Sequence, residues 1–280
     1  MSKISLQMYT MREYTKSIAE LEGTVQKLSD IGFEMLQYSV PENYDAAQVK
    51  RIFDRFGMKN DSVYCDSLAL EEKACRVLSQ CELFDTKYVR LDSIPVGLTS
   101  SATGYKMYAH YLNNAAEEYK KHGVKLLYHF HAFEFIRFGN TTGIEIFLVE
   151  SDPEVIQIIP DTHWIHSGGR SICRFLETYK ERYDYVHFKD FGIAAREETL
   201  EARPILYAPV GEGIKNSTCC SLRLQKEQWR SPFVFLLFVV FDMVNPFVGK
   251  LSAWLRSYQS SRIPRLPARS CSCRGRCRAR

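Results

Sequence analysis

Short apolar segments and longer amphipathic segments alternate along the first two thirds of the chain. Apolar runs and alternating apolar positions predict seven strands, at residues 4–9, 33–40, 62–65, 87–91, 126–131, 155–161 and 185–190. Apolar residues at helical spacing between them predict six helices, at residues 17–31, 45–56, 68–81, 105–121, 143–150 and 171–182. This strict alternation indicates an α/β fold built on a parallel sheet.

The number of strands favours a closed barrel over an open sheet. A (β/α)8 barrel typically needs about 250 residues, and the chain has 280. No Gly-x-Gly-x-x-Gly motif follows the first predicted strand, so a nucleotide-binding Rossmann fold has no phosphate loop. We therefore expect a (β/α)8 TIM barrel.

Polar side chains stand at the ends of three successive predicted strands. His129 and His131 end the first of these strands and Glu134 follows it, Asp161 ends the second, and His187 and Lys189 belong to the third. Because the carboxyl ends of parallel strands meet at one end of a barrel, we expect these groups to lie together. Imidazole and carboxylate groups suit a divalent metal or proton transfer. The first of these strands, taken alone, is more typical of a core strand with incidental polar residues at its exposed end, and the recurrence of the pattern in the next two strands weakens that interpretation.

Charge is unevenly distributed along the chain. The composition, 45% hydrophobic and 25% charged, is that of an ordinary globular protein, with a net charge of +4. Residues 214–280 hold 13 lysines and arginines but only 2 acidic residues, which leaves 24 basic and 31 acidic residues in residues 1–213. The larger part is therefore acidic, which argues against a nucleic-acid partner, because phosphate contacts need positive charge.

The sequence predicts a cytoplasmic protein without a membrane anchor. Its first residues are too short and too polar a stretch for a signal peptide. The cysteines of residues 1–213 are scattered, as is usual for reduced thiols. The apolar run at residues 233–241 is far shorter than the about 20 residues that a transmembrane helix needs.

Several motifs, in this order, resemble those of sugar phosphate isomerases/epimerases of the xylose-isomerase-like TIM-barrel superfamily. They are LQMYTMRE at residues 6–13, YHFHAFEF at 128–135, DTHW at 161–164 with the glycine pair 168–169, VHFKD at 186–190 and APVGEG at 208–213. The resemblance covers residues 1–213. It implies two parts, a TIM-barrel body at 1–213 and a divergent, basic, partly disordered segment at 214–280.

The resemblance implies a site for one divalent metal ion, Mn2+ first, with Mg2+, Co2+ or Zn2+ as alternatives. Its ligands would be Glu134, Asp161 and His187. The family's fourth ligand, a glutamate on strand eight, has no counterpart here. Residues 235–242 are the best substitute for that strand, with Val240 at the glutamate's position and Asp242 at the end as a stand-in carboxylate.

The resemblance also implies the chemistry. Family members remove a proton next to a sugar carbonyl and pass through an enediolate that the metal stabilises. Glu134 would act as base, His129 would orient it or bind substrate oxygens, and Lys189 would stabilise the enediolate. His131, Trp164 and Glu212 are expected to bind the sugar or sugar phosphate. A homo-oligomer stays open.

Two other functions remain open. The loss of the family pattern after Gly213, where the sequence turns rich in Arg, Cys and Ser, indicates a frameshifted or misassembled C-terminus, so the chain could be an inactive remnant with a last βα unit that is altered or incomplete. An endonuclease IV-like phosphodiesterase is the other alternative. Metal content separates the three: one ion for an isomerase, several zinc ions for the endonuclease, and none held tightly by a remnant.

Overall fold

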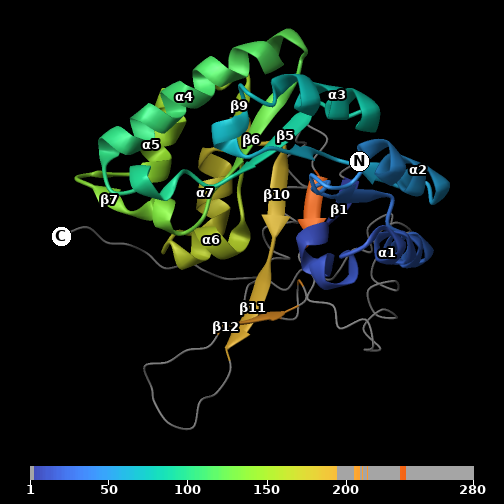
Figure 1. Cartoon of the computed structure of the whole chain (residues 1–280). Coiled ribbons are helices and arrows are strands. Elements are labelled where there is room, and N and C mark those ends of the chain that lie inside the picture. Colours follow the sequence, from blue (N-terminus) through green and yellow to red (C-terminus); the bar gives the residue numbers. More distant parts are fainter. Residues whose placement is uncertain (1–2, 194–204, 209, 211–212, 214–233, 238–280) are drawn as a thin grey trace.

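The computed structural model describes residues 3–193, 205–208, 210, 213 and 234–237. Parallel strands form its centre and helices surround them (Figure 1). The strands of the central sheet are β1 (Lys3–Gln7), β2 (Met35–Gln37), β3 (Lys59–Asn60), β4 (Val63–Tyr64), β5 (Tyr88–Asp92), β6 (Lys125–His129), β9 (Ile156–Ile159), β10 (Tyr185–Phe188) and β13 (Val234–Leu237).

These strands close into a ring. One arc runs in the order β10-β13-β1-β2-β3 and the other in the order β4-β5-β6-β9. Only Asp61 and Ser62 separate β3 from β4, so these two short strands share one position in the ring. At the other junction, Asp161 forms a parallel bridge with His187 and thereby connects the chain after β9 to β10. The predicted TIM-barrel fold is confirmed.

The eighth position of the barrel is filled by β13, drawn in orange between β10 and β1 in Figure 1. Val234 pairs with Lys3 on one side and with Tyr185 on the other, and both pairings are parallel. A strand was predicted within residues 235–242, and the structure starts it one residue earlier. Val240, Asp242 and the rest of the proposed segment 214–280 lie outside the described residues.

Seven helices are found in the described part of the chain, and together they cover the outside of the barrel (Figure 1). They are α1 (Ile18–Ile31), α2 (Ala46–Arg55), α3 (Ala74–Phe84), α4 (Ala102–Lys121), α5 (Gly143–Glu150), α6 (Thr162–Ser167) and α7 (Ile172–Thr178). Within that part, none of them is long and apolar enough to cross a membrane.

Helix α1 shows how the sequence sets the bounds of these helices. Ser17 begins it with a capping box, in which its hydroxyl accepts from the Glu20 amide at 3.2 Å and Glu20 accepts from the Ser17 amide at 3.0 Å. Gly32 ends it with a φ of 107°, a left-handed conformation that glycine adopts without strain. Between these two ends, Leu21 and Val25 pack into the core.

Short elements near the ends of the barrel strands were not predicted. They are the 3-10 helices η1 (Met8–Tyr14), η2 (Ser67–Ala69), η3 (Val96–Leu98), η4 (Phe133–Phe135) and η5 (Lys180–Arg182), the hairpin β7 (Arg137–Phe138) with β8 (Thr141–Thr142), and the hairpin β11 (Asp190–Ile193) with β12 (Ile205–Ala208). The first predicted strand therefore ends at Gln7 rather than at residue 9. Helix α6 was also missed.

A polar layer fills part of the barrel's interior. Buried Asp61 follows β3 and accepts hydrogen bonds from Ser62 at 2.7 Å and from Gln37 at 3.5 Å. Tyr185 belongs to β10, at the other end of the arc that contains β3, and its hydroxyl donates to the Asp61 carbonyl at 3.2 Å. Burial raises the pKa of Asp61 to about 6, and the charge of Arg90 lies among the interactions that oppose this rise.

Candidate metal centre and substrate cleft

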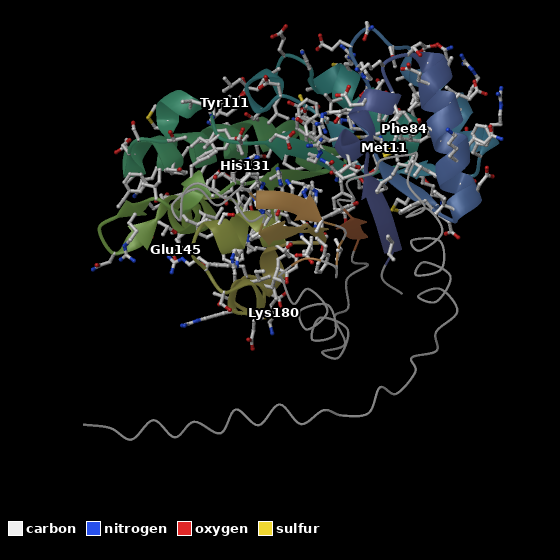
Figure 2. The ribbon with its side chains drawn as sticks, turned by 90° about the horizontal axis from the view of Figure 1, so that it is seen from below. Met11, Phe84, Tyr111, His131, Glu145 and Lys180 are labelled. Atoms are coloured by element: carbon white, nitrogen blue, oxygen red, sulfur yellow. The ribbon has the colours of Figure 1, made fainter. Side chains whose placement is uncertain are left out.

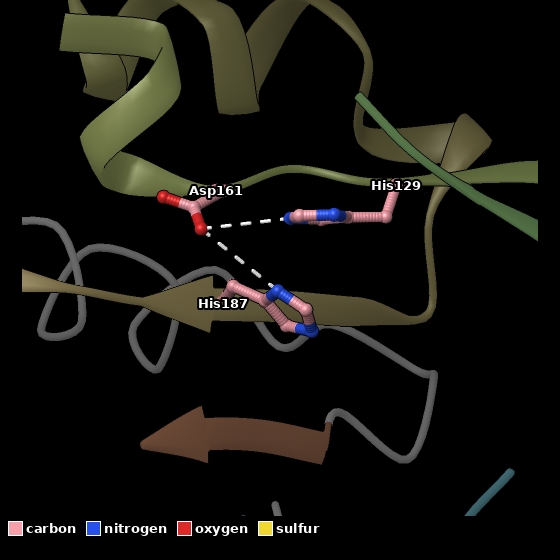
Figure 3. A group of neighbouring side chains, drawn as sticks. All are labelled: His129, Asp161 and His187. Atoms are coloured by element: carbon pink, nitrogen blue, oxygen red, sulfur yellow. Dashed lines mark ion pairs between the residues drawn. The ribbon is translucent and has the colours of Figure 1, made fainter. Parts of the chain in front are cut away.

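Three strand ends bring His129, Asp161 and His187 together. His129 is the last residue of β6, and His187 lies within β10. Asp161 follows Pro160 and is the N-cap of α6, where its Oδ1 accepts from the amides of His163 at 2.7 Å and Trp164 at 3.2 Å. Capping holds the carboxylate in a fixed orientation and leaves its other oxygen, Oδ2, turned toward the two imidazoles (Figure 3).

The geometry of this cluster suits a small cation. Oδ2 of Asp161 lies 3.6 Å from Nε2 of His129 and 3.9 Å from Nδ1 of His187, and one ligand atom from each residue lies within 4.8 Å of the others. All three side chains are buried. Among the described residues, Nε2 of His129 and Oδ2 of Asp161 have no hydrogen-bond partner. Buried polar atoms are normally paired, so these two fit a bound ion. Two imidazoles and a carboxylate form a donor set that suits a divalent transition metal such as Zn2+ or Fe2+.

The electrostatics of the cluster favour the forms that bind metals. Burial alone would raise the pKa of Asp161, but the neighbouring His129 and Lys189 outweigh it and hold that pKa below its usual value. Burial lowers the pKa of His187 well below its usual value, and the charge of His129 acts in the same direction. The site therefore presents a carboxylate and a neutral imidazole near neutral pH, which are the ligand forms.

Glu134 lies outside this group of ligand atoms. It belongs to η4, and its carboxylate accepts from the Tyr128 hydroxyl at 2.5 Å and from the His131 amide at 2.8 Å. Burial raises its pKa, and these hydrogen bonds oppose the rise. Of the predicted ligands Glu134, Asp161 and His187, the structure brings the last two together. The roles of Glu134 as ligand and as base stay predictions.

The residues predicted to contact substrate lie beside the cluster. The ring of His131 lies 4.8 Å from that of His129 and 5.1 Å from that of Trp164, measured between centroids. The Lys189 ammonium lies 5.0 Å from the centroid of the Trp164 ring. Burial lowers the pKa of His131 to about 4 and also lowers that of Lys189, which Asp161 partly restores. Glu212 lies outside the described residues.

A cleft of about 1060 Å³ is lined by His129, His131, Trp164 and Lys189, whereas Glu134, Asp161 and His187 are not among its lining residues. It is also lined by Tyr9, Arg12, Tyr38, Tyr64, Arg90 and Asp92, among others. His131 lies well inside the molecule in Figure 2, which looks from below Figure 1 at the carboxyl end of β10, whereas Glu145 and Lys180 lie toward its edge. The cleft therefore lies at the carboxyl ends of the strands, where the site was predicted, and its role as the site stays a prediction.

Two charged residues near the cluster were not predicted. Asp92 ends β5, and its Oδ1 lies 3.6 Å from Nδ1 of His129. Arg90, two residues earlier on the same strand, forms an ion pair with Asp92. The strand-end rule that singled out Asp161 also applies to Asp92, since it directly follows the predicted strand at residues 87–91.

The sequence and the fold of the chain are similar to those of several known proteins. Over 90 residues the chain is 32% identical to the inosose dehydratase of Geobacillus kaustophilus (strain HTA426), a match that covers 32% of this chain and 27% of that protein. The fold is similar to that of a sugar phosphate isomerase/epimerase from Parabacteroides distasonis ATCC 8503, with a TM-score of 0.72, 17% identity, and coverage of 93% of this chain and 94% of the other. It is also similar to that of a xylose isomerase-like TIM barrel protein from Mycobacterium smegmatis in complex with magnesium, with a TM-score of 0.61, 12% identity, and coverage of 92% and 95%.

The family model described as xylose isomerase-like TIM barrel matches residues 25–240. This range contains all of β2 to β13, and it continues past residue 213, where the motif resemblance ends. The chain belongs to the xylose isomerase-like TIM barrel family.

Proposed function

We propose that the protein is a metal-dependent isomerase or epimerase of a sugar or sugar phosphate, which acts by removing a proton next to a carbonyl group. One observation carries the proposal: Nε2 of His129 and Oδ2 of Asp161 face each other at 3.6 Å, buried and without a hydrogen-bond partner among the described residues, beside His187 at the carboxyl ends of the strands. A structural ion pair alone does not explain this convergence of metal-binding atoms at the end of the barrel where such enzymes react.

His129, Asp161 and His187 would hold the cation. A bound divalent cation would polarise the substrate carbonyl and stabilise negative charge on the enediolate oxygen. Mn2+ is the first candidate on the resemblance alone, with Mg2+, Co2+ and Zn2+ as alternatives, and of these the two imidazoles suit Zn2+ best. The complex of the Mycobacterium smegmatis protein with magnesium supports a divalent metal in this fold. Glu134 is not in this group of ligand atoms, so it would complete the site only if its carboxylate, which now accepts from Tyr128 and the His131 amide, came closer to them.

Glu134 is our candidate for the base that removes the proton. Its raised pKa suits a group that must both accept and return a proton, and Tyr128 and the His131 amide hold the carboxylate in one orientation. The neutral His131 ring and Trp164 would bind the sugar, and the Lys189 ammonium would stabilise the developing negative charge. We place Glu212 at the substrate as well, on the resemblance alone.

Dehydration of a sugar-like ketone begins with the same proton removal, which makes a dehydratase the second candidate. The matching stretch of the Geobacillus kaustophilus inosose dehydratase supports it. The two outcomes differ in what leaves: a dehydratase expels a hydroxyl group as water, whereas an isomerase or epimerase returns the proton. We further infer a small-molecule substrate rather than a nucleic acid, because residues 1–213 are acidic, and a cytoplasmic location, because the cysteines of that part are scattered as in proteins with reduced thiols.

The first test is Mn2+ binding to the purified chain by titration calorimetry, beside Asp161→Asn and Glu134→Gln. Exposed Glu118, paired with Lys121 on α4, offers Glu118→Gln as the control. We expect one Mn2+ per chain, with affinity lost in Asp161→Asn and kept in the control. A loss in Glu134→Gln as well would make that residue a ligand. No binding by folded protein would indicate an inactive remnant. If the same titration with Zn2+ shows several ions per chain, the protein would instead be the phosphodiesterase.

The second test is a screen of ketoses, aldoses and their phosphates in D2O, followed by proton NMR. Deuterium incorporated at the carbon next to the carbonyl, without loss of water, is the expected result. Incorporation with formation of an unsaturated or deoxy product would make the chain a dehydratase. Enzyme that binds metal but exchanges no substrate proton would contradict both activities.

A further inference from the structure

Asp92 and His129 are direct neighbours on adjacent strands. In the parallel ladder between β5 and β6, Asp92 pairs with His129, which places their side chains next to each other. The Ser93 amide then donates to the His129 carbonyl at 3.2 Å and extends the ladder by one hydrogen bond. Oδ1 of Asp92 lies 3.6 Å from Nδ1 of His129, on the opposite side of the ring from Asp161.

The Asp92 carboxylate is itself held in place from behind. Nη1 of Arg90 forms an ion pair with its Oδ1, and Nη2 of the same guanidinium donates to the Ser39 hydroxyl at 2.7 Å. The Arg90 side chain is 7% exposed. A buried, planar guanidinium with two fixed partners has little freedom to move, so the orientation of Asp92 follows from that of Arg90.

This arrangement determines which nitrogen of His129 is available to a metal. A carboxylate only accepts hydrogen bonds, so Asp92 favours the form of His129 that carries its proton on Nδ1. Nε2 then presents its lone pair to Oδ2 of Asp161, 3.6 Å away. Two acceptors that face each other need a positive charge between them: a second proton on the ring supplies it without metal, and a bound cation would take the place of that proton. Both atoms lack another partner among the described residues.

We propose that Asp92, held by Arg90 and Ser39, is a positioning residue that fixes His129 with Nδ1 protonated and Nε2 aimed at the metal. This inference rests on the proposed function, because it takes His129 as a ligand. In many metal sites a carboxylate accepts a hydrogen bond from the second ring nitrogen of a metal-binding histidine, and we assign this role to Asp92. Loss of such a carboxylate typically lowers metal affinity by about 10- to 100-fold. The alternative is that Asp92 only neutralises the charge of the buried Arg90 guanidinium.

The test combines Zn2+ affinity with NMR of the histidine rings in 15N-labelled, Zn2+-loaded full chain. The variants are Asp92→Ala, which removes the acceptor, and Asp92→Asn, which keeps an acceptor for Arg90 and His129 but removes the charge. His129→Gln assigns the ring signals. Asp54→Asn, on the surface of α2 next to Lys50, is the control for loss of a carboxylate.

We expect wild-type His129 to bind Zn2+ through Nε2 and to show a slowly exchanging proton on Nδ1. Asp92→Ala should lose that slow exchange and bind Zn2+ about 10- to 100-fold more weakly, with Asp92→Asn between it and the wild type. Circular dichroism confirms that each variant is folded, and Asp92→Asn serves if Asp92→Ala is not.

Three results would overturn the inference. If His129→Gln weakens binding while both Asp92 variants keep the wild-type affinity and Nδ1 proton, Asp92 only neutralises Arg90. Ligation through Nδ1 would reverse the assignment of the ring. If folded wild-type protein binds no Zn2+ at all, the proposed function fails first and the role of Asp92 fails with it.

Discussion

The hydroxyl of Tyr128 donates a 2.5 Å hydrogen bond to Oε1 of Glu134, and both side chains are fully buried. Tyr128 is in turn fixed by the Ile94 amide, which donates to its hydroxyl at 3.2 Å. The donated hydrogen bond stabilises the ionised form of Glu134, while burial disfavours it. Tyr128 therefore keeps the pKa of the candidate base from rising further.

Replacing Tyr128 with Phe should raise the pKa of Glu134, because the carboxylate loses a donor. If Glu134 is the base, the acidic limb of the kcat/KM profile will move to higher pH, since more of the enzyme is protonated at any given pH. The free energy of unfolding should fall by about 1.5–3 kcal/mol, the usual contribution of a hydrogen bond to a charged group. Tyr119→Phe is the control, because it loses a buried 2.8 Å hydrogen bond to the Leu70 carbonyl away from Glu134. An acidic limb that moves equally in both variants would contradict the prediction.

Asp61 should make the protein less stable as the pH rises from 4 to 6. Its pKa is raised to about 6 by burial, so between these values the folded chain keeps a proton that the unfolded chain has lost. The contribution of Asp61 to the free energy of unfolding is therefore largest below pH 4 and is fully lost above pH 6. A shift of about two pH units corresponds to about 3 kcal/mol.

Asp61→Asn, which imitates the protonated carboxyl, isolates this effect. Urea denaturation of wild type and variant from pH 4 to pH 7 should show the variant gaining on the wild type by up to about 3 kcal/mol, with no further gain above pH 6. Other titrating groups cancel in the difference. A difference that is constant over the whole range would show that Asp61 ionises as freely in the folded chain as in the unfolded one.

Metal should stabilise the wild-type chain and leave Asp161→Asn unaffected. Mn2+ at 100 times its dissociation constant should raise the free energy of unfolding by about 2.7 kcal/mol, and EDTA should reverse the gain. Asn is as good an N-cap as Asp, so the variant keeps the start of α6 while it removes the ligand charge. Thermal denaturation with and without Mn2+ measures the effect. Equal stabilisation of both proteins would place the ion elsewhere.

Gly213→Ala should destabilise the fold by about 1–3 kcal/mol through overpacking. The Gly213 amide donates to Oδ2 of buried Asp190 at 3.2 Å, and a Cβ at this position would collide with the Asp190 carboxylate and the Phe191 carbonyl. Gly192→Ala is the matched control, because a Cβ there meets nothing within 4 Å. Urea denaturation of the two variants compares them. Equal stability of the two variants would show that the close approach of Gly213 to Asp190 is not needed for the stability of the fold.

Periodicity predicted the barrel well because the signal is repeated along the chain. Helix α5 was predicted at residues 143–150 and is found at Gly143–Glu150. The prediction was incomplete where a single side chain determines the local backbone conformation. Capping of α6 by Asp161 turned a residue expected at a strand end into the start of a helix, which no hydrophobic period shows.

The candidate site was predicted in part. The strand-end rule found His129, Asp161 and His187, because the ends of parallel strands must converge. It also placed Glu134 just past the first of these strands, but it did not predict the turn η4 or the hydrogen bond from the Tyr128 hydroxyl that hold the carboxylate where it lies. Such a contact depends on tertiary packing, and the spacing of residues in the sequence does not encode it.

The parallel pairing of β1 with β13, which closes the barrel, also affects how the chain folds while it is being synthesised. Lys3 pairs with Val234, so 231 further residues must be synthesised after Lys3 before its partner is complete. At ~5–20 residues per second, β1 waits roughly 10 to 50 s for this neighbour while one of its edges lacks a partner. An unpaired strand edge is a template for association with other chains, so we expect newly made chains to need protection during that interval. Aggregation should therefore depend on the rate of translation as much as on the stability of the finished barrel.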